Sequence, residues 1–361
     1  MPLTIASQYG LIDQRDFFNK VIAAKDMSNY YLLKKGEFAY NKSYSKGFDY
    51  GSIKRLNVYE QGCLSTLYIC FSIETDEVDS DYLECFFDTL SWYHDVSAIC
   101  AEGARNHGLL NVDVKAFFKD VNIEMPSQIQ EQRKISVFIN TIDHLITLHQ
   151  RKCDELKKVK KFMLQKMFPK KGEKNPEIRF DGFTNDWEQR KLGDVVEFLD
   201  TMRKPLEGAK RISGPYPYYG ASGIVDYVDG YLFDEELVLL SEDGANITDR
   251  NYPVCFLASG KYWVNNHAHV LKTKDGNENN FICNSLERKD YKQYNSGMAM
   301  PKLNQEVCRG IPISCPSFDE QKKIGDYFSN LDHLITLHQR KCEELKNVKK
   351  YMLQNMFAKG E

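Results

Sequence analysis

A long internal repeat constrains the fold of this chain more than any other feature of its sequence. The stretches 131–168 and 320–357 align without a gap, 189 positions apart, and 26 of their 38 residues are identical. A repeat of this length indicates one structural unit that is used twice. Each copy follows a segment of globular composition, and those two segments differ from each other. The chain therefore alternates twice between a variable unit and a constant one.

Each copy of the repeat has the spacing of an amphipathic helix. Apolar residues recur every three or four positions over five turns or more, which is typical of helices that pair as in a coiled coil. One copy alone would expose its whole apolar stripe, so we expect the two copies to pack on each other as an antiparallel pair with an approximate two-fold axis. The residues expected in the core of this pair are Ile135, Ile142, Leu145, His149, Leu156, Ile324, Leu331, Leu334, His338 and Leu345.

Two further features of the repeat carry predictions. The motifs Pro126-Ser127-x-x-Gln130 and Pro316-Ser317-x-x-Glu320 each fit a capping box at a helix start, in which the serine side chain accepts from a backbone amide. His149 and His338 interrupt the stripe at equivalent positions. We expect them to be partly buried and to set the register, with a metal or proton-transfer role as the less favoured alternative.

The variable units have short apolar runs broken by Gly, Asn and Asp, which predict short strands and loops with some helix. The predicted fold class is α+β, with two globular domains separated by two long antiparallel helices. The expected segments are a first domain at 1–126, a first helix at 127–170, a second domain at 177–316 and a second helix at 317–358.

Composition indicates the cellular compartment in which the protein works. No run approaches the roughly 18 apolar residues of a membrane span, and the N-terminus lacks the basic and apolar regions of a signal peptide. The ten cysteines include no C-x-x-C pair, so free thiols in a reducing compartment are expected rather than disulfides or a zinc site. These features predict a cytoplasmic protein.

Motifs of catalysis are missing from the sequence. It has no G-x-x-x-x-G-K-[ST] stretch for nucleotide phosphates and no N-P-P-[FY] loop for a target adenine. His267 and His269 lie two apart and would share one face of a strand, but the sequence shows no third or fourth metal ligand beside them. We therefore expect a non-catalytic chain that binds no metal or cofactor.

The ordered set of segments resembles the specificity subunit of a type I restriction–modification system. The resemblance rests on the order of the units, the two helix entries, the stretch IRFDGFTNDWEQRKLG and the stretches YNKSYSKG and LLSEDGANI, and it covers nearly the whole chain. It implies two target-recognition domains, each reading one half of a split double-stranded DNA sequence. It also implies that the helices space the half-sites and dock two modification (methyltransferase) subunits, through which restriction (translocase and nuclease) subunits join. S-adenosylmethionine, ATP and Mg²⁺ are implied for those partners.

One departure from the family pattern concerns the first domain. It has no counterpart of Ile178–Phe198, so roughly 40 or more residues of the pattern are missing at its start. We expect this domain to be N-terminally shortened, and either incomplete or completed by another chain.

Tyrosine and asparagine beside basic residues suit contacts with phosphates and base edges, although the same mixture suits an ordinary β surface. The residues expected to contact DNA are Tyr40, Asn41, Lys42, Tyr44, Lys46, Arg203, Lys204, Lys210, Arg211, Ser222, Lys261, Asn265, Asn266 and His267. Partner subunits are expected on leftover helix faces, including the basic stretches Lys157–Lys161 and Lys346–Lys350. Two alternatives remain: a coiled-coil adaptor that binds proteins, favoured by the acidic first unit, and an enzyme whose site assembles late in folding.

Overall fold

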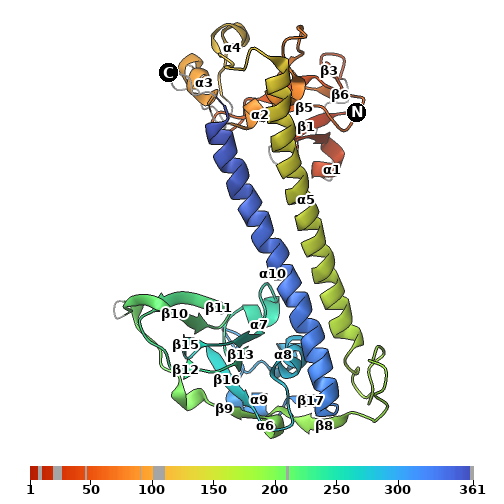
Figure 1. The fold of residues 1–361 in the computed structure, drawn as a ribbon, viewed down its shortest axis with the longest axis vertical. Helices are drawn as coiled ribbons and strands as arrows, with labels where there is room; N and C mark the ends of the chain where they lie inside the picture. Colours follow the sequence, from red (N-terminus) through yellow and green to blue (C-terminus); the bar gives the residue numbers. More distant parts are fainter. Residues whose placement is uncertain are drawn as a thin grey trace. The chain divides into compact units, whose positions relative to one another are not determined.

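The computed structural model describes residues 1–6, 10–18, 27–44, 47–89, 91–100, 110–208 and 211–357. These residues form two compact units, and each unit contains part of both repeated helices. Unit 1 comprises 1–150 and 340–361, and unit 2 comprises 151–339. The long helices are α5 (Ile129–Lys166) and α10 (Phe318–Asn355), labelled in Figure 1. The architecture is mixed helix and sheet, as predicted.

Unit 1 is built from short antiparallel strand pairs and small helices. The sheets are β1–β2, β3–β6 and β5–β4–β7. Its elements before the long helix are β1 (Leu3–Ala6), β2 (Gly10–Asp13), α1 (Gln14–Phe18), β3 (Tyr31–Lys34), β4 (Phe38–Asn41), β5 (Ser52–Arg55), β6 (Gln61–Leu64), β7 (Tyr68–Phe71), α2 (Ser80–Asp88), α3 (Tyr93–Ile99) and α4 (Val114–Asp120). An aromatic core joins β4 and α2 to Ile135 and Ile139 of α5 and to Phe357 after α10.

Unit 2 contains two four-stranded sheets, ordered β11–β10–β15–β12 and β14–β13–β16–β9, and the pair β17–β8. Its elements are β8 (Glu188–Lys191), α6 (Leu192–Val195), β9 (Val196–Phe198), the short 3-10 turn η1 (Asp200–Met202), β10 (Ser213–Gly220), β11 (Gly223–Val228), β12 (Phe233–Asp234), β13 (Leu237–Ser241), α7 (Asn246–Asp249), β14 (Cys255–Ala258), β15 (Lys261–Val264), β16 (Ala268–Thr273), α8 (Asn279–Glu287), a second turn η3 (Tyr291–Tyr294), α9 (Gln305–Arg309) and β17 (Pro312–Cys315).

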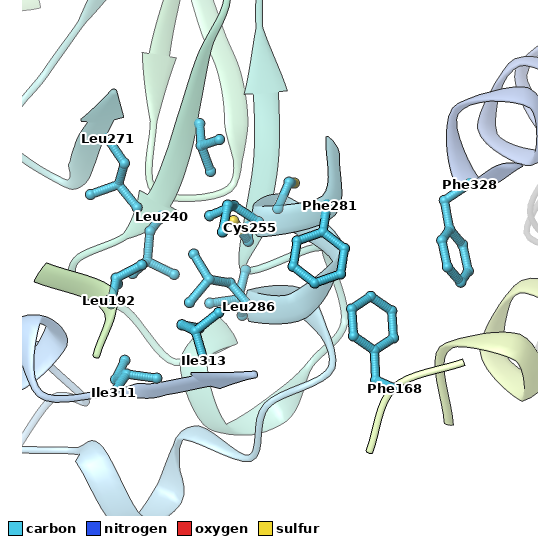
Figure 2. Packing of buried hydrophobic residues seen from close by; sticks show 14 of the residues in the cluster. Phe168, Leu192, Leu240, Cys255, Leu271, Phe281, Leu286, Ile311, Ile313 and Phe328 are labelled. Atoms are coloured by element: carbon cyan, nitrogen blue, oxygen red, sulfur yellow. The ribbon is translucent and has the colours of Figure 1, made fainter. Parts of the chain in front are cut away.

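The central strand β13 of unit 2 is buried on both faces. Val238 and Leu240 face a core that includes Phe281 of α8 and Phe328 of α10, whereas Leu237 and Leu239 face a second core on the other side. This alternation follows from the two-residue period of a strand. Phe168, at the end of the first repeat, stacks on Phe281 with ring centroids 5.4 Å apart (Figure 2). The repeat is thus part of the hydrophobic core of unit 2.

Within each unit the two long helices run antiparallel, as predicted. In unit 1 Asp143 pairs with Lys349 at 2.7 Å, and one turn later the carbonyl of Ile146 accepts from the Cys342 thiol at 3.3 Å. In unit 2 Met163 and Leu164 pack into the core that contains Ile324 and Phe328. The expected core residues Ile135, Ile142, Leu156, Ile324 and Leu331 are buried, and His149, His338 and Leu345 are half-buried.

Two predictions about the repeat are wrong. Leu145 and Leu334, at equivalent positions, are exposed, because Ile139, Ile146, Ile335 and Cys342 lie closer to the centre of the helix contact. The first capping box also fails, since α5 begins at Ile129 and Ser127 lies one residue before the N-cap position. At the second helix Ser317 occupies the N-cap position, and its backbone carbonyl accepts the first hydrogen bond of α10, from the Gln321 amide at 3.0 Å. All ten cysteines are free thiols. Among the described residues, no helix is both long and apolar enough to cross a membrane.

Candidate nucleic-acid interface

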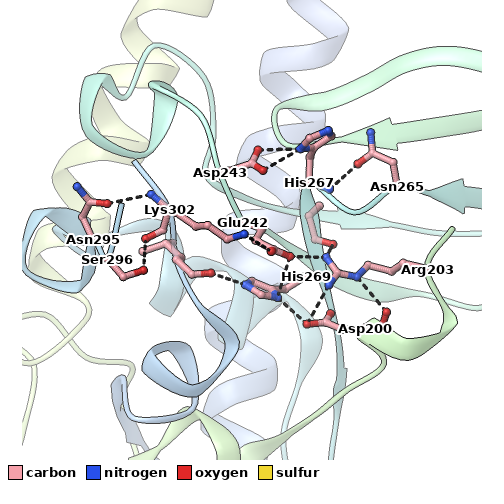
Figure 3. A network of polar contacts seen from close by, with 12 residues as sticks. Asp200, Arg203, Glu242, Asp243, Asn265, His267, His269, Asn295, Ser296 and Lys302 are labelled. Atoms are coloured by element: carbon pink, nitrogen blue, oxygen red, sulfur yellow. Dashed lines mark hydrogen bonds and ion pairs between the residues drawn. The ribbon is translucent and has the colours of Figure 1, made fainter. Parts of the chain in front are cut away.

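Four segments that lie far apart in the sequence of unit 2 meet along one edge. They are the β10–β11 turn at Ser222, Asp243 after β13, the β15–β16 loop Asn265–His267, and the segment Asn295–Lys302, which we together call the polar rim. Figure 3 shows Asp243, His267 and Lys302 of this rim. The Asn265 amide donates to the Tyr219 carbonyl at 3.0 Å, which fixes the loop beside the turn. The Glu242 amide donates to the His267 carbonyl at 2.9 Å. Backbone hydrogen bonds therefore bring the rim together.

The loop Asn295–Lys302 is bound to the same edge. The Gly244 amide donates to the Pro301 carbonyl at 3.0 Å, and Asp243 and Lys302 form an antiparallel bridge. His267 contacts Asp243 with its Nδ1 2.8 Å from a carboxylate oxygen. The rim consequently presents amide, imidazole and ammonium groups side by side, which are the groups that hydrogen-bond to base edges and phosphates.

A buried ion network lies behind the rim. His269, with 1% of its surface exposed, places Nδ1 2.6 Å from Asp200 and Nε2 2.8 Å from the Leu303 carbonyl. Arg203 contacts Glu242 at 2.7 Å, and Lys302 lies 3.3 Å from the same carboxylate. Figure 3 shows these side chains converging between β16 and the loop that precedes α9. The network ties the rim segments to the sheet.

The protonation of His269 follows from its partners. Burial disfavours its charged form, but hydrogen bonds to Asp200 and Cys308 outweigh burial and raise the pKa of His269 to about 10. Burial likewise opposes charge on Asp200, yet the bond from His269 leaves the pKa of Asp200 below its usual value. His269 is therefore an imidazolium at neutral pH, and both of its nitrogens donate.

Asp200, Glu242 and His269 are also close enough to hold a metal ion. A metal needs a lone pair on the imidazole. Because Nε2 donates to a carbonyl oxygen, only Nδ1 could be the ligand, and Nδ1 is hydrogen-bonded to the Asp200 carboxylate at 2.6 Å. Glu242 is already neutralised by Arg203 and Lys302. The residues therefore fit an internal ion network better than a metal site.

The structure separates the predicted contact residues of unit 2 into two groups. Ser222, Lys204, Asn266 and His267 are exposed at or beside the rim, and their contact with DNA stays a prediction. Lys261 is exposed away from the rim, with its ammonium 4.8 Å from the ring of Tyr231. Lys210 lies outside the described residues.

Three of these predicted contacts need correction. Arg203 is nearly buried, because Asp200, Glu242 and the Ala268 carbonyl surround its guanidinium. Asn265 is buried and accepts from the His267 amide, so it shapes the loop. Arg211 lies 4.6 Å above the Tyr218 ring and pairs with Asp226 at 3.2 Å. All three side chains make their polar or ring contacts with other residues of unit 2.

In unit 1 the prediction for Tyr40 is wrong. Its side chain is fully buried, its hydroxyl donates to the Tyr50 carbonyl at 2.6 Å, and its ring stacks on Phe117 with centroids 5.2 Å apart. The neighbouring Asn41 and Lys42 are half-buried and Tyr44 is exposed. Lys46 lies outside the described residues. The strand β4 is buried on both faces, and Phe38 and Tyr40 lie in the aromatic core of unit 1.

Sequence reasoning missed Met298, Met300 and Lys302 as rim residues. Both methionines are exposed, and Lys302 joins the ion network. Gly297 and Pro301 on either side of these methionines indicate a turn, but nothing in the sequence shows that the turn lies beside the polar groups of the rim.

One lysine of each basic helix stretch is paired within its own unit, and partner docking by the remaining, exposed lysines stays a prediction. Lys160 pairs with Asp332 at 2.6 Å, and Lys349 pairs with Asp143 at 2.7 Å and Asp88 at 3.4 Å. These two lysines occupy equivalent positions of the repeat. They stabilise the helix pair within each unit, so they are not free for a partner.

The fold and rim define a class: a module of mixed helix and sheet, with a polar edge, that is built onto an antiparallel helix pair. Residues 184–347 match the family described as "Type I restriction modification DNA specificity domain". This part of the chain resembles that family, and the resemblance predicted from the sequence is confirmed.

Two curated relatives agree with this resemblance. The chain is 35% identical over 144 residues to a putative type I restriction enzyme specificity subunit of Haemophilus influenzae, covering 40% of this chain and 36% of the relative. It is 25% identical over 186 residues to the MjaVIII specificity subunit of Methanocaldococcus jannaschii, covering 48% and 43%. Both matches thus span less than half of each relative.

The likeness in fold is more extensive. The crystal structure of a type I restriction–modification S subunit from M. genitalium superposes with a TM-score of 0.66. It covers 91% of this chain and 84% of that one, at 15% sequence identity.

Proposed function

We propose that this chain is the DNA-binding specificity subunit of a type I restriction–modification complex. The single observation that carries the proposal is the polar rim of unit 2, where Ser222, Asn266, His267 and Lys302 gather within a segment that matches a DNA specificity domain. Hydrogen-bonding side chains on one edge can reach the base edges of a major groove. Each unit would read one half of a bipartite target, and the chain itself would perform no catalysis.

The proposed partners are two modification subunits, and exposed apolar residues of the long helices support this. Unit 1 exposes Leu145, Leu148, Val348 and Tyr351, and unit 2 exposes Leu334, Leu337, Val159 and Phe162, each between 37% and 62%. The two quartets occupy equivalent positions of the repeat. Each is accompanied by an equivalent exposed ion pair, Lys341–Glu344 or Lys152–Glu155. A duplicated surface suits two copies of one partner. Restriction subunits would join through these partners, and S-adenosylmethionine, ATP and Mg²⁺ would be bound there.

The docking surfaces can be tested one at a time. Leu148→Asp with Tyr351→Asp should remove one modification subunit from the co-purified complex, and Leu337→Asp with Phe162→Asp should remove the other. Thr147→Asp and Thr336→Asp, beside Leu148 and Leu337 and also exposed, are the matched controls. Complexes that keep two modification subunits with either double variant would contradict this assignment.

The function itself is tested by selection of random duplexes with the chain co-expressed with its modification subunit. A split consensus of two short blocks supports two working domains, whereas a single block means that only one domain reads DNA. Without enrichment by an intact complex, the protein-binding adaptor becomes the better explanation. Binding should also weaken steeply with salt, because phosphate contacts release counterions.

The helices are proposed to set the distance between the half-sites. Deleting one heptad from each helix shortens each by about 10 Å. The permitted spacer should then shrink by about three base pairs, while the two half-site sequences stay the same. An unchanged spacer in the shortened protein would refute the spacing role.

A further inference from the structure

The loop Gly297–Pro301 presents two apolar side chains to solvent in an otherwise polar rim. Met298 has an exposed fraction of 104% and Met300 one of 61%. Single exposed apolar residues are ordinary on a protein surface. Two on one short loop, beside groups suited to base contact, call for a functional explanation.

The loop is held in one shape. The Asn295 Oδ1 accepts from the amides of Gly297 and Lys302, both at 2.9 Å, and the Ser296 amide donates to the Lys302 carbonyl at 2.8 Å. A Cβ at position 297 would lie 1.8 Å from the Met300 carbonyl oxygen, so only glycine fits there. The fold therefore builds a closed turn whose outward residues are methionines.

The neighbours of the loop indicate what the methionines meet. The Pro301 carbonyl and Lys302 bind the segment after β13, which also carries Asp243, the partner of His267. The exposed amide of Asn266 lies in the same rim. Amide and imidazole groups suit the hydrogen-bonding edges of bases in the major groove, where the thymine C5 methyl group is the apolar feature of the base pairs. A flexible thioether adapts well to such a small apolar target.

We infer that Met298, supported by Met300, recognises thymine through the C5 methyl group in the half-site that unit 2 reads. This inference rests on the proposed function. It assigns a specificity-determining contact to a loop, and it places at least one A·T pair at a defined position of that half-site. A wedge inserted between base pairs is the competing use of such a side chain, but wedges of this kind enter from the minor groove, which offers little for the amide and imidazole groups of the rim to distinguish.

The test compares thymine with uracil, which lacks only the methyl group. The chain co-expressed with its modification subunit is first used to select a consensus, and each thymine of that duplex is then replaced in turn by deoxyuridine. Wild type should lose about three- to tenfold in affinity at one or two positions, the effect of one or two buried methyl groups. Met298→Ala should bind the thymine duplex more weakly by a similar factor. Its affinity should not change further when deoxyuridine replaces thymine at the sensitive position. Met298→Leu should keep most of the preference.

A matched control is Ile212→Ala, since Ile212 is also an exposed apolar residue but lies at the opposite end of the β10–β11 hairpin from Ser222. It should leave both affinities unchanged. If Met298→Ala binds like wild type while selective, salt-sensitive binding persists, the inference is overturned and the proposed function stands. If Met298→Ala loses the same affinity for the thymine and the uracil duplex and also bends DNA less, the side chain is a wedge and the inference is overturned. If wild type selects no sequence, the proposed function fails, and the inference fails with it.

Discussion

Lys160 and Asp332 form an ion pair at 2.6 Å in unit 2, and the repeat forms the same pair in unit 1 with the roles of its copies exchanged. There Lys349, equivalent to Lys160, contacts Asp143, equivalent to Asp332, at 2.7 Å. Such reciprocity requires an antiparallel arrangement of two like helices, because each copy then supplies one cation and one anion. In unit 1 a third residue, Asp88, also faces Lys349.

This difference predicts unequal effects of removing the two lysines. Lys349→Ala leaves the largely buried Asp88 with one cation fewer, so we expect a loss of about 2–3 kcal/mol in the free energy of unfolding. Lys160→Ala removes a pair whose aspartate is half exposed, and about 0.5–1 kcal/mol is expected. Urea unfolding measures both, with the exposed Lys158→Ala as control. Equal losses at the two positions would contradict the role given to Asp88.

Gln132 and Gln321 make the same connection at the start of each long helix. Gln132 accepts from the Asp79 amide and donates to the carbonyls of Glu77 and Pro126, and Gln321 does the same with Glu278, Gly276 and Pro316. Asp79 and Glu278 are the N-cap residues of α2 and α8. Each buried amide thus ties a domain helix to a long helix.

Replacing either glutamine should destabilise its own unit. Gln132→Ala or Gln321→Ala leaves buried backbone groups without partners, and about 2–3 kcal/mol is expected. Gln132→Glu should be nearly as costly, since a carboxylate accepts but cannot donate to the two carbonyls. The exposed Gln130→Ala is the matched control in the same helix turn. Amide hydrogen exchange can assign the loss to the start of the helix, and unchanged protection there would refute the connection.

Arg179 forms a bidentate pair with Glu320, at 2.7 and 2.8 Å, and Glu320 is only 1% exposed. Arg179→Ala should cost about 3 kcal/mol because it leaves a buried charge. Arg179→Lys should recover little, since an ammonium cannot bond both oxygens in the same geometry. The double variant Arg179→Ala with Glu320→Gln should regain part of the loss in thermal unfolding. Glu131→Gln, at the equivalent exposed position of the first copy, should change stability little.

The raised pKa of His269 predicts a pH dependence of stability. Its folded-state value of about 10 lies above the ordinary value of 6.5, so its stabilising contribution is complete below about pH 6.5 and is lost as pH rises through 10. The unfolding midpoint of wild type should therefore fall towards pH 10 more steeply than that of His269→Gln. The exposed His267→Gln serves as the control. Parallel profiles for wild type and His269→Gln would show that His269 is not charged in the fold.

The periodic pattern of apolar residues predicted the two long helices and most, but not all, of their buried positions. A spacing of three and four residues predicted two helices and most of their buried positions, since apolar residues at Ile135, Ile142 and Leu331 recur on one side. It did not predict that Leu145 and Leu334 lie at the exposed edge. The apolar face that a sequence pattern predicts is wider than the contact between two helices. The position of the partner helix determines which residues of that face are buried.

The rim was less predictable, because polar residue types do not reveal their partners. Arg203, Asn265 and Tyr40 resemble DNA contacts by composition, but tertiary neighbours supply carboxylates, amides and rings that hold them inside. Met298 was overlooked because an apolar residue in a loop has no meaning until its neighbours are known.

The sequence by itself determined the two-fold reuse of one helix, the antiparallel pairing of its copies and the family resemblance of residues 184–347. These follow from local periodicity and from ordered motifs along the chain. Only the tertiary structure decided which polar groups serve the interior and which form the rim. That choice depends on backbone bonds between Tyr219 and Asn265, between Gly244 and Pro301, and on the charge balance around His269. Such bonds join residues that the sequence keeps far apart.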